Sequence, residues 1–487
     1  SIYGSSISQL AGVRYAWTDN SEPDQPETKP KVVTMMTSTR ARRWGALLTF
    51  LLVCASCSSV SAQSDAFVRV EDGRFVLNGH YYYFTGVNFW YGMNLGSEGE
   101  GGDRARLVME LDSMAARGLK NLRVMASSEG PNTEPFRVKP TLQPEPRVYN
   151  QDLLKGLDFL LAEMGKRDMK AVLVLNNFFD WSGGMAQYVS WTTGTPIPYP
   201  SPGEGGYSSD DLQNYASQFY ADFDAQRLYL DFIFELIHRK NHITGLLYRD
   251  DPTIMTWELA NEPRGAAHSD EYVEWVDKAA GFIQLQDPNH LVCLGGEGKL
   301  VPGNGTQFEW VSTSPYLDYI TIHIWIENWG WFDPKKSDET FPTAVGRAMG
   351  YLADHVSLAR AINKPMVVEE FGVSRDGGSF EISAGTAYRD SYYRVVLEAL
   401  YRLAQEGNVA AGSNVWSWSG SGRPVTPGSL WQKGEPFTGD PPNEQQGRYS
   451  IYDKDSSTLD ILTEYAGLMS DLDATIENGA ETGDVRE

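Results

Sequence analysis

The sequence predicts a (β/α)8 barrel, in which eight parallel strands alternate with helices, with long loops at one end and a short N-terminal β-hairpin. Short apolar or aromatic segments alternate along the chain with longer stretches whose apolar residues recur three and four positions apart, as in amphipathic helices. Eight such short segments occur, and eight parallel strands joined by right-handed crossovers close a barrel. A chain of 487 residues, 41% of them hydrophobic, can bury the core that this fold needs.

The elements follow one another from about residue 67. A hairpin is expected first, with strands at 67–70 and 74–77 around the turn Glu71-Asp-Gly73. The barrel strands are expected near 81–91, 120–126, 170–178, 253–261, 291–296, 319–325, 365–371 and 412–419. The helices are expected at 104–117, 153–167, 225–239, 271–285, 345–361, 388–404 and 459–472.

An open doubly wound sheet is the alternative arrangement of such elements. That fold usually carries a glycine-rich phosphate turn after its first strand, and Thr85-Gly-Val-Asn-Phe-Trp-Tyr-Gly92 is not one. The barrel is therefore favoured.

Four long insertions, expected to be non-helical, each follow a predicted strand: 128–150, 180–221, 326–343 and 420–458. Loops that follow the strands lie at the C-terminal face of a barrel, where barrel enzymes have their active sites. These loops carry Trp181, Trp191, Trp329, Trp331 and Trp431. We therefore expect a deep cleft with aromatic walls.

The segment before the barrel resembles an export signal. A basic stretch around Arg42, an apolar run from Ala46 and small residues ending at Ala62 predict a secretory signal peptide over residues 35–62. A short anchor helix is the alternative, and lipid attachment at Cys57 fits the preceding residues poorly. The protein is accordingly expected to be secreted or periplasmic.

The predicted organisation has four parts. Residues 1–34, upstream of Met35, are expected to be read-in from a neighbouring reading frame, and residues 63–472 to form the catalytic domain. An acidic tail follows at 473–487. Removal of the signal leaves Cys293 as the remaining cysteine, in an apolar strand, so no internal disulfide is expected.

Composition excludes several partners. The formal net charge of −23 argues against nucleic acid, whose backbone needs an excess of Lys and Arg. After the signal there is no apolar run long enough to span a membrane. No His or Asp cluster has metal-ligand spacing, so neither a metal nor another cofactor is expected. The protein is expected to be a monomer.

Glutamates end two of the predicted strands, in Trp257-Glu-Leu-Ala-Asn-Glu-Pro-Arg264 and Val367-Val-Glu-Glu-Phe-Gly372. Glycoside hydrolysis needs two carboxyl groups on either side of the bond, and neighbouring strand ends can supply them. Side chains alternate along a strand, so one of Glu369 and Glu370 should face the cleft, and physics alone leaves that choice open.

These motifs resemble glycoside hydrolase family 5, and in particular its β-mannanase branch. The resemblance runs from about residue 67 to residue 472. It also includes Gly86-Val-Asn-Phe-Trp-Tyr91, Asn121-Leu-Arg-Val124, Asn176-Asn-Phe-Phe-Asp-Trp-Ser-Gly-Gly184, His323-Ile-Trp325 and Asn414-Val-Trp-Ser-Trp418. It implies a retaining hydrolase of β-1,4-mannosidic bonds in mannan, glucomannan or galactomannan.

The resemblance also implies roles for single residues. Glu262 matches the general acid/base and Glu370, directly before the aromatic-Gly pair, the nucleophile. Arg123 is expected to lower the pKa of Glu370, and burial to raise that of Glu262. The other expected site residues are Asn261, which holds the sugar 2-hydroxyl, His323 beside the acid/base, Trp416 under the sugar, and the substrate contacts Trp90, Tyr91, Asn177, Trp181, Trp325 and Glu297.

The sequence departs from the family pattern at two points. Many members have His-x-Tyr after strand six, where this chain has Trp325, and many cellulases have a His where this chain has Asn176-Asn177. Both departures weaken the alternative of a β-1,4-glucanase. A non-catalytic carbohydrate-binding protein on the same barrel is a further alternative.

The mode of attack is left open by the sequence. The branch favours internal cleavage, whereas the long loops resemble those of exo-acting β-mannosidases. A loop that closes one end of a cleft turns an internal cutter into a terminal one.

Overall fold

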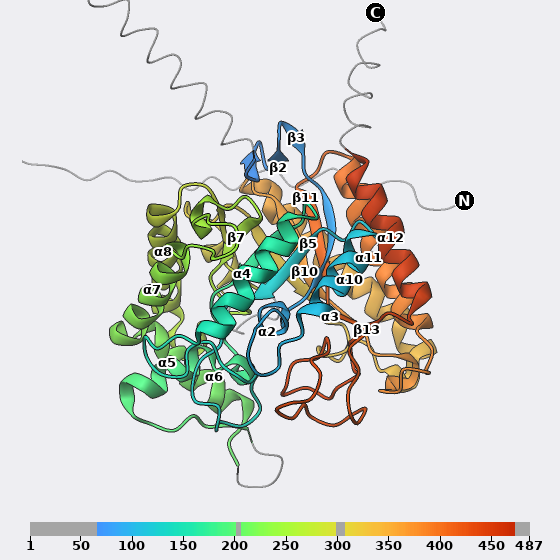
Figure 1. The fold of residues 1–487 in the computed structure, drawn as a ribbon. Helices are drawn as coiled ribbons and strands as arrows, with labels where there is room; N and C mark the ends of the chain where they lie inside the picture. Colours follow the sequence, from blue (N-terminus) through green and yellow to red (C-terminus); the bar gives the residue numbers. More distant parts are fainter. Residues whose placement is uncertain (1–65, 201–205, 299–306, 473–487) are drawn as a thin grey trace, which may run out of the picture. The chain divides into compact units, whose positions relative to one another are not determined.

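A computed structural model describes residues 66–200, 206–298 and 307–472, and the predicted upstream segment, signal peptide and acidic tail lie outside them. Eight strands form one parallel sheet in the order β8-β7-β6-β5-β4-β11-β10-β9 (Figure 1). They are β4 (Phe84–Asn88), β5 (Asn121–Met125), β6 (Lys170–Val174), β7 (Ile254–Glu258), β8 (Leu291–Cys293), β9 (Ile320–Ile324), β10 (Met366–Phe371) and β11 (Ala410–Val415). All eight overlap the predicted strands.

The two end strands of this sheet, β8 and β9, approach each other and bring it close to a full circle. The backbone N–H of Asp318, just before β9, donates to the carbonyl of Val292 at 2.8 Å. At the other end of the same seam, the N–H of His323 donates to the carbonyl of Glu297 at 3.1 Å. The predicted (β/α)8 barrel is therefore confirmed.

Helices surround the strands (Figure 1). Their apolar faces pack inward, as in α4, where Leu153, Leu157 and Leu161 are buried. The side chain of Asn150 caps this helix by accepting from two backbone N–H groups of its first turn. The helices are α2 (Gly92–Leu95), α3 (Arg104–Ala115), α4 (Gln151–Gly165), α5 (Gly184–Thr193), α6 (Ser209–Ser217), α7 (Phe223–Ile237), α8 (Ser269–Gln286), α9 (Phe308–Val311), α10 (Ser337–Ala361), α11 (Ala387–Gln405) and α12 (Ser456–Ser470).

Three of the insertions are more helical than predicted. The 180–221 insertion contains α5 and α6, α10 begins at Ser337 inside the 326–343 insertion, and α12 begins at Ser456 inside the 420–458 insertion. The expectation of a loop without helices was wrong for α6 because this segment is short and mostly polar, and a capping box at Ser208 starts it. None of the helices in the described part of the chain is both long and apolar enough to cross a bilayer.

A small antiparallel sheet covers one end of the barrel. It consists of β1 (Arg69–Glu71), β2 (Arg74–Leu77) and β3 (His80–Tyr81), one strand more than predicted. Its first turn has positive φ at Asp72 and Gly73, as a two-residue hairpin requires. Phe75 packs in one apolar cluster with residues that begin the barrel strands, Met255, Leu291, Val367 and Ala411 among them.

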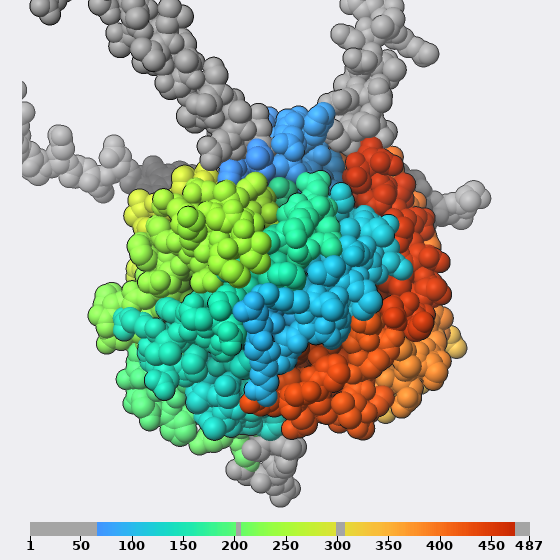
Figure 2. Space-filling model, viewed as in Figure 1, coloured from blue at the N-terminus to red at the C-terminus, as the bar shows by residue number. Residues whose placement is uncertain are grey.

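The opposite end of the barrel carries the long loops. Figure 2 shows the blue hairpin at one end and the orange-red segment that follows β12 (Trp418–Gly420) at the other. This segment leads to β13 (Ile451–Tyr452), which pairs with β12. The loops therefore gather at the C-terminal ends of the strands, as predicted.

Candidate active site

A cavity of about 460 Å³ opens at the C-terminal ends of the barrel strands. Both glutamates that the sequence predicts as catalytic, Glu262 and Glu370, line it. The other residues around it are Phe179, Trp181, Ser209, Gln213, Asn261, Arg264, Glu297, Trp325, Asn328, Trp329, Trp416, Pro441, Asn443 and Glu444.

Glu262 lies just beyond the end of β7, in an unusual backbone conformation. Its φ is +47°, a backbone conformation that residues other than glycine rarely adopt. Its backbone N–H donates to the carbonyl of Gly295 at 2.9 Å. Its carboxylate lies 2.7 Å from Nδ1 of His323. The strained backbone therefore holds the carboxyl group against the imidazole at the cavity surface.

Glu370 lies near the end of β10, and three side chains contact its carboxylate. Arg123 donates from Nη1 to Oε1, and Trp325 donates from its indole Nε1 to Oε2 at 3.2 Å. Nδ1 of His323 is 3.4 Å from Oε2. Trp325 thus supplies a hydrogen bond at the position where many family members have a tyrosine.

The neighbour Glu369 does not line the cavity and is fully buried. The pairing of β10 with β9 is irregular between Val368 and Glu370, so the regular alternation of side chains is broken there. Both glutamates consequently reach Arg123, while Glu370 alone faces the cavity.

The two cavity glutamates lie close to each other. Carboxylate oxygens of Glu262 and Glu370 and a ring nitrogen of His323 all lie within 4.8 Å of one another. Retaining glycosidases have carboxyl groups about 5–5.5 Å apart, whereas inverting enzymes leave about 6.5–9.5 Å for a water molecule. The observed spacing is that of a retaining site.

Arg123 connects the groups beneath the cavity. It donates two hydrogen bonds to Glu258, at 2.6 and 2.9 Å, and one to Oδ1 of Asn261 at 2.9 Å. Asn261 in turn donates to Oδ1 of Asn177 at 3.2 Å. The guanidinium therefore fixes the positions of the residues on β5, β7 and β10 relative to one another.

The pKa shifts are the reverse of those expected from the sequence. Burial raises the pKa of Glu370, and the positive charges of His323 and Arg123 reduce this shift without reversing it. Burial also acts to raise the pKa of Glu262, but the hydrogen bond and charge of His323 outweigh it and lower that pKa. The pKa of His323 is raised to about 10; burial lowers it, but the charge of Glu370 and the hydrogen bond to Glu262 dominate.

The predicted substrate contacts fall into two groups. Trp416, Trp181, Trp325 and Glu297 line the cavity together with Asn261. By contrast, the three residues that do not line it are Trp90, Tyr91 and Asn177.

Trp90 and Tyr91 instead contact the segment that follows β11. The indole N–H of Trp90 donates to the backbone carbonyl of Gly439 at 2.9 Å. The hydroxyl of Tyr91 donates to the backbone carbonyl of Trp418 at 3.2 Å. They therefore hold the 420–458 loop against the barrel.

The sequence interpretation missed the residues that this loop brings to the cavity, namely Pro441, Asn443 and Glu444. The side chain of Glu444 is half-buried, its buried Oε2 has no hydrogen-bond partner among the described residues, and desolvation of the carboxyl group raises its pKa to about 8. The Oδ1 atom of Asn443 is likewise unpartnered. The available signals were the position of the loop after a strand and the resemblance of Gly439-Asp-Pro-Pro442 to exo-acting β-mannosidases, and neither identified Asn443 or Glu444.

Arg264 was also missed, although it lies two residues after Glu262. It forms a two-point ion pair with Glu297, and the two side chains together form part of the cavity wall. Burial raises the pKa of Glu297 to about 7, and the charge of Glu262 adds to this.

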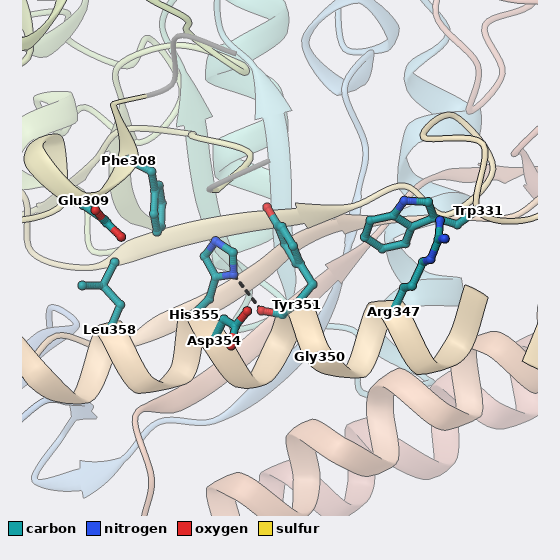
Figure 3. A pocket seen from close by; sticks show the side chains of 9 residues that line it. All are labelled: Phe308, Glu309, Trp331, Arg347, Gly350, Tyr351, Asp354, His355 and Leu358. Carbon is teal, nitrogen blue, oxygen red and sulfur yellow. Dashed lines mark hydrogen bonds between the residues drawn. The ribbon is translucent and has the colours of Figure 1, made fainter. Parts of the chain in front are cut away.

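A second cavity, of about 480 Å³, runs along α10 (Figure 3). Arg347, Tyr351 and His355 point toward it from α10, while Trp331 comes from the preceding loop and Phe308 from α9. None of the predicted catalytic or substrate-contact residues lines it, but Trp331, expected in the wall of the cleft, does. The hydroxyl of Tyr351 donates to the carbonyl of Glu297 at 2.6 Å, so this face supports the wall of the first cavity.

Two groups of side chains in the described chain have spacing that could hold a metal ion. One is Glu262, His323 and Glu370, and the other is Glu258, Cys293 and Glu369. Their members come from different strands, so spacing along the sequence does not reveal them. Arg123 contacts a carboxylate in each group.

A (β/α)8 barrel with two glutamates at retaining distance across its mouth defines a retaining glycoside hydrolase. The profile of glycoside hydrolase family 5, described as β-mannosidase-like, matches residues 65–473. The chain belongs to this family.

Relatives agree with this assignment. Mannan endo-1,4-beta-mannosidase 1 of Oryza sativa subsp. japonica is 32% identical over 368 residues, which cover 72% of this chain and 78% of that protein. The family 5 mannosidase of Rhizomucor miehei is 37% identical with a TM-score of 0.77, covering 85% and 99% of the two chains. The endo-beta-1,4-mannanase of Thermotoga petrophila is 25% identical with a TM-score of 0.59, covering 84% and 79%.

The indole donor to Glu370 can be tested directly. Trp325→Phe keeps an aromatic ring but removes the N–H, and a hydrogen bond to a carboxylate favours its charged form. We expect the pKa of Glu370 to rise by about half a unit to one unit. Carbon-13 NMR of labelled glutamate carboxyls, with Glu370→Gln to assign the signal, measures it. An unchanged or lower pKa would contradict the role of this contact.

Proposed function

We propose that this protein hydrolyses β-1,4-mannosidic bonds in mannan polysaccharides with retention of configuration, with Glu370 as nucleophile and Glu262 as general acid/base. One observation carries the proposal: two carboxylates, Glu370 buried and Glu262 12% exposed, face the same cavity with oxygens within 4.8 Å of each other. Each has its own partner, Arg123 for Glu370 and His323 for Glu262.

The first step breaks the glycosidic bond. The carboxylate of Glu370 attacks the anomeric carbon, and a proton passes from Glu262 to the leaving oxygen, so a covalent glycosyl-enzyme forms. Arg123 and the indole N–H of Trp325 hold the attacking oxygens in place. Trp416, which is buried and lines the same cavity, offers its ring as a platform for the sugar.

The second step releases the sugar. Glu262, now ionised, removes a proton from a water molecule, which attacks the anomeric carbon and frees Glu370. Two inversions give net retention. Asn261, held by Arg123, is available to contact the 2-hydroxyl of the sugar during both steps.

The acid proton belongs to the His323–Glu262 pair. His323 carries a positive charge near neutral pH, since its pKa is about 10, and its Nδ1 lies 2.7 Å from Glu262. A proton can therefore move along this hydrogen bond to Glu262 as the leaving oxygen gains charge. This accounts for an acid whose own pKa is low in the free enzyme.

Mannose as the substrate sugar is supported by the relatives. The rice protein is named a mannan endo-1,4-beta-mannosidase, and the Rhizomucor and Thermotoga proteins are named a mannosidase and an endo-beta-1,4-mannanase. Cleavage of β-1,4-glucan by the same residues is the alternative that an assay must exclude.

The release of single mannose units from the ends of mannan chains is a second candidate activity. The 420–458 loop contributes Pro441, Asn443 and Glu444 to the cavity wall, and Oε2 of Glu444 and Oδ1 of Asn443 have no partner in the described chain. Unpartnered polar atoms at a cavity wall are suited to bind the hydroxyls of a terminal sugar. Such a wall favours exo attack over the internal cleavage of the named mannanases.

We also propose that the protein is exported. The basic and apolar pattern of residues 35–62 and its small residues up to Ala62 support this. N-terminal sequencing of the exported protein should begin at Gln63, which is also the test of whether residues 1–34 belong to the enzyme. An exported chain that begins before Met35 would contradict both expectations.

The proposed roles of Glu262 and Glu370 predict different losses of hydrolytic activity when each is replaced by alanine. Glu262→Ala should lower kcat on mannan by at least about a hundredfold, the range for a lost general acid. It should retain far more activity on a 4-nitrophenyl β-mannoside, whose leaving group needs no proton. Glu370→Ala should lose activity on both substrates, because the covalent step is absent.

The exposed Glu274 provides the matched control, and Glu274→Ala should keep wild-type rates on both substrates. The proposal is contradicted if mannan hydrolysis survives in either active-site variant. It is also contradicted if the wild type releases reducing sugar from carboxymethyl cellulose and not from mannan.

Products from mannohexaose separate the two modes of attack. Mannose as the sole product from the first minutes indicates exo attack, and early mannobiose and mannotriose indicate endo attack. We predict mannose, and we predict that Glu444→Ala slows its release, because the terminal sugar loses a contact. Early internal products from the wild type would contradict the exo assignment and leave the endo-mannanase.

A further inference from the structure

A second pair of buried carboxyl groups lies beneath the two cavity glutamates. Glu258 ends β7 and Glu369 lies in β10; neither side chain is exposed, and neither lines the cavity. A carboxylate oxygen of each, together with Sγ of Cys293, lies within 4.8 Å of the others. These side chains are too deep to contact the substrate.

The two members of this pair have unequal partners. Glu258 accepts two hydrogen bonds from Arg123. Glu369 accepts none from the described residues; its nearest cationic atoms are Nε of Arg123 and Nε2 of His323, both 3.6 Å from Oε2. Leaving a buried carboxylate without a donor is costly. A proton on either carboxyl would make it a donor to the other.

The charges around the pair lead to the same conclusion. The titratable groups that face it are Arg123 from β5, the thiol of Cys293 from β8, the Tyr319 hydroxyl just before β9, His323 from β9, Glu370 from β10 and the Tyr229 hydroxyl from α7, with Glu262 on the far side of His323. Four carboxyl groups thus meet two cations, because Arg264, which also acts on Glu262, is paired with Glu297. If all four were ionised, two negative charges would remain uncompensated in a largely buried array, which is strongly unfavourable.

A metal ion at Glu258, Cys293 and Glu369 would also compensate charge. However, both oxygens of Glu258 already accept from the guanidinium of Arg123, and the cluster lies below the cavity floor. A proton is the compensating charge that fits this space.

We propose that Glu258 and Glu369 hold one proton between them and act together as a single negative charge that positions Arg123 and His323. Through these two side chains the pair sets the charge around Glu370. This last part rests on the proposed function of Glu370, whereas the shared proton does not.

The directions of the pKa shifts agree with the geometry. Burial raises the pKa of Glu258 to about 8. The positive charge of Arg123 acts to lower this pKa, and the negative charge of Glu369 acts to raise it further. For Glu369 burial acts in the same direction, but Arg123 and His323 outweigh it and lower the pKa. One raised and one lowered value within a contacting pair is the behaviour of two carboxyls that share a proton.

The shared proton links stability to pH. A glutamate in the unfolded chain titrates near about 4.3, while the pair keeps its proton up to a pH of about 8. Between these values the folded protein binds one proton that the unfolded chain has lost. The stability that this shared proton contributes is therefore full below the unfolded pKa and is lost as the pH rises toward 8, whereas the lowered pKa of Glu369 acts in the opposite direction only below the unfolded pKa.

The test compares the full-length wild type with Glu258→Gln, Glu369→Gln and the exposed control Glu274→Gln. Urea unfolding at several pH values from about 5.5 to 7.5 gives the number of protons released on unfolding. In each single variant the remaining carboxyl is ionised beside Arg123, so no proton is shared. We expect both variants to release about one proton fewer than the wild type, and the control to match the wild type.

A wild-type pH dependence in either variant would overturn the proposal, because the proton would then not depend on both carboxyls. If one variant fails to fold, the other decides. Failure of both to fold also counts against it, since each keeps the single negative charge of the pair.

The effect on Glu370 has its own readout, the acidic limb of kcat/KM on 4-nitrophenyl β-mannoside. Because the pair has the same charge in each single variant, this limb should move by less than about 0.3 pH unit. A shift of the acidic limb by about one unit to lower pH would mean that the substitution had removed a negative charge near Glu370. That would contradict the proposal that the pair carries the same single negative charge in the wild type and in each variant. If the wild type shows no hydrolysis, the proposed function fails, while the proton count still tests the pair.

Discussion

The guanidinium of Arg123 is the group on which the site depends. It is buried in the middle of β5 and contacts carboxylates from β7 and β10, Glu258 and Glu370, as well as the side chain of Asn261. A buried arginine is stable only with such partners, and buried carboxylates need a cation in turn. The three strands are therefore held together by charge as well as by the backbone ladder, and the cavity glutamates are fixed before any substrate binds.

The barrel could be predicted because its signal is local and repeated. Each strand, such as β6 with its run of buried Lys170–Val174, is short, apolar and followed by an amphipathic helix, so the pattern alone identifies all eight. Strand ends also carry the polar residues, which made Glu262 and Glu370 recognisable. Helices α5 and α6 were missed because they are short and lie inside an insertion that carries few other helix signals.

Other features depend on tertiary contacts that no local pattern encodes. The break in alternation that lets Glu369 and Glu370 both reach Arg123 comes from an irregular pairing with β9. The hydrogen bond from Trp325 and the entry of Glu444 into the cavity likewise follow from how distant segments meet. The same holds for the pKa shifts, where the direction at Glu262 is set by His323, 61 residues further along the chain.

The central claim is that Glu370 is the nucleophile of a retaining mannoside hydrolase, supported from below by Arg123 and the Glu258–Glu369 pair. Incubation with 2-deoxy-2-fluoro-β-mannosyl fluoride, followed by proteolysis and mass spectrometry, tests it most directly, because the fluorine slows release of the covalent sugar. The account predicts one fluoromannosyl group per chain, attached to Glu370. A label on Glu369 or on any other residue, or turnover of this reagent with inversion, would contradict it.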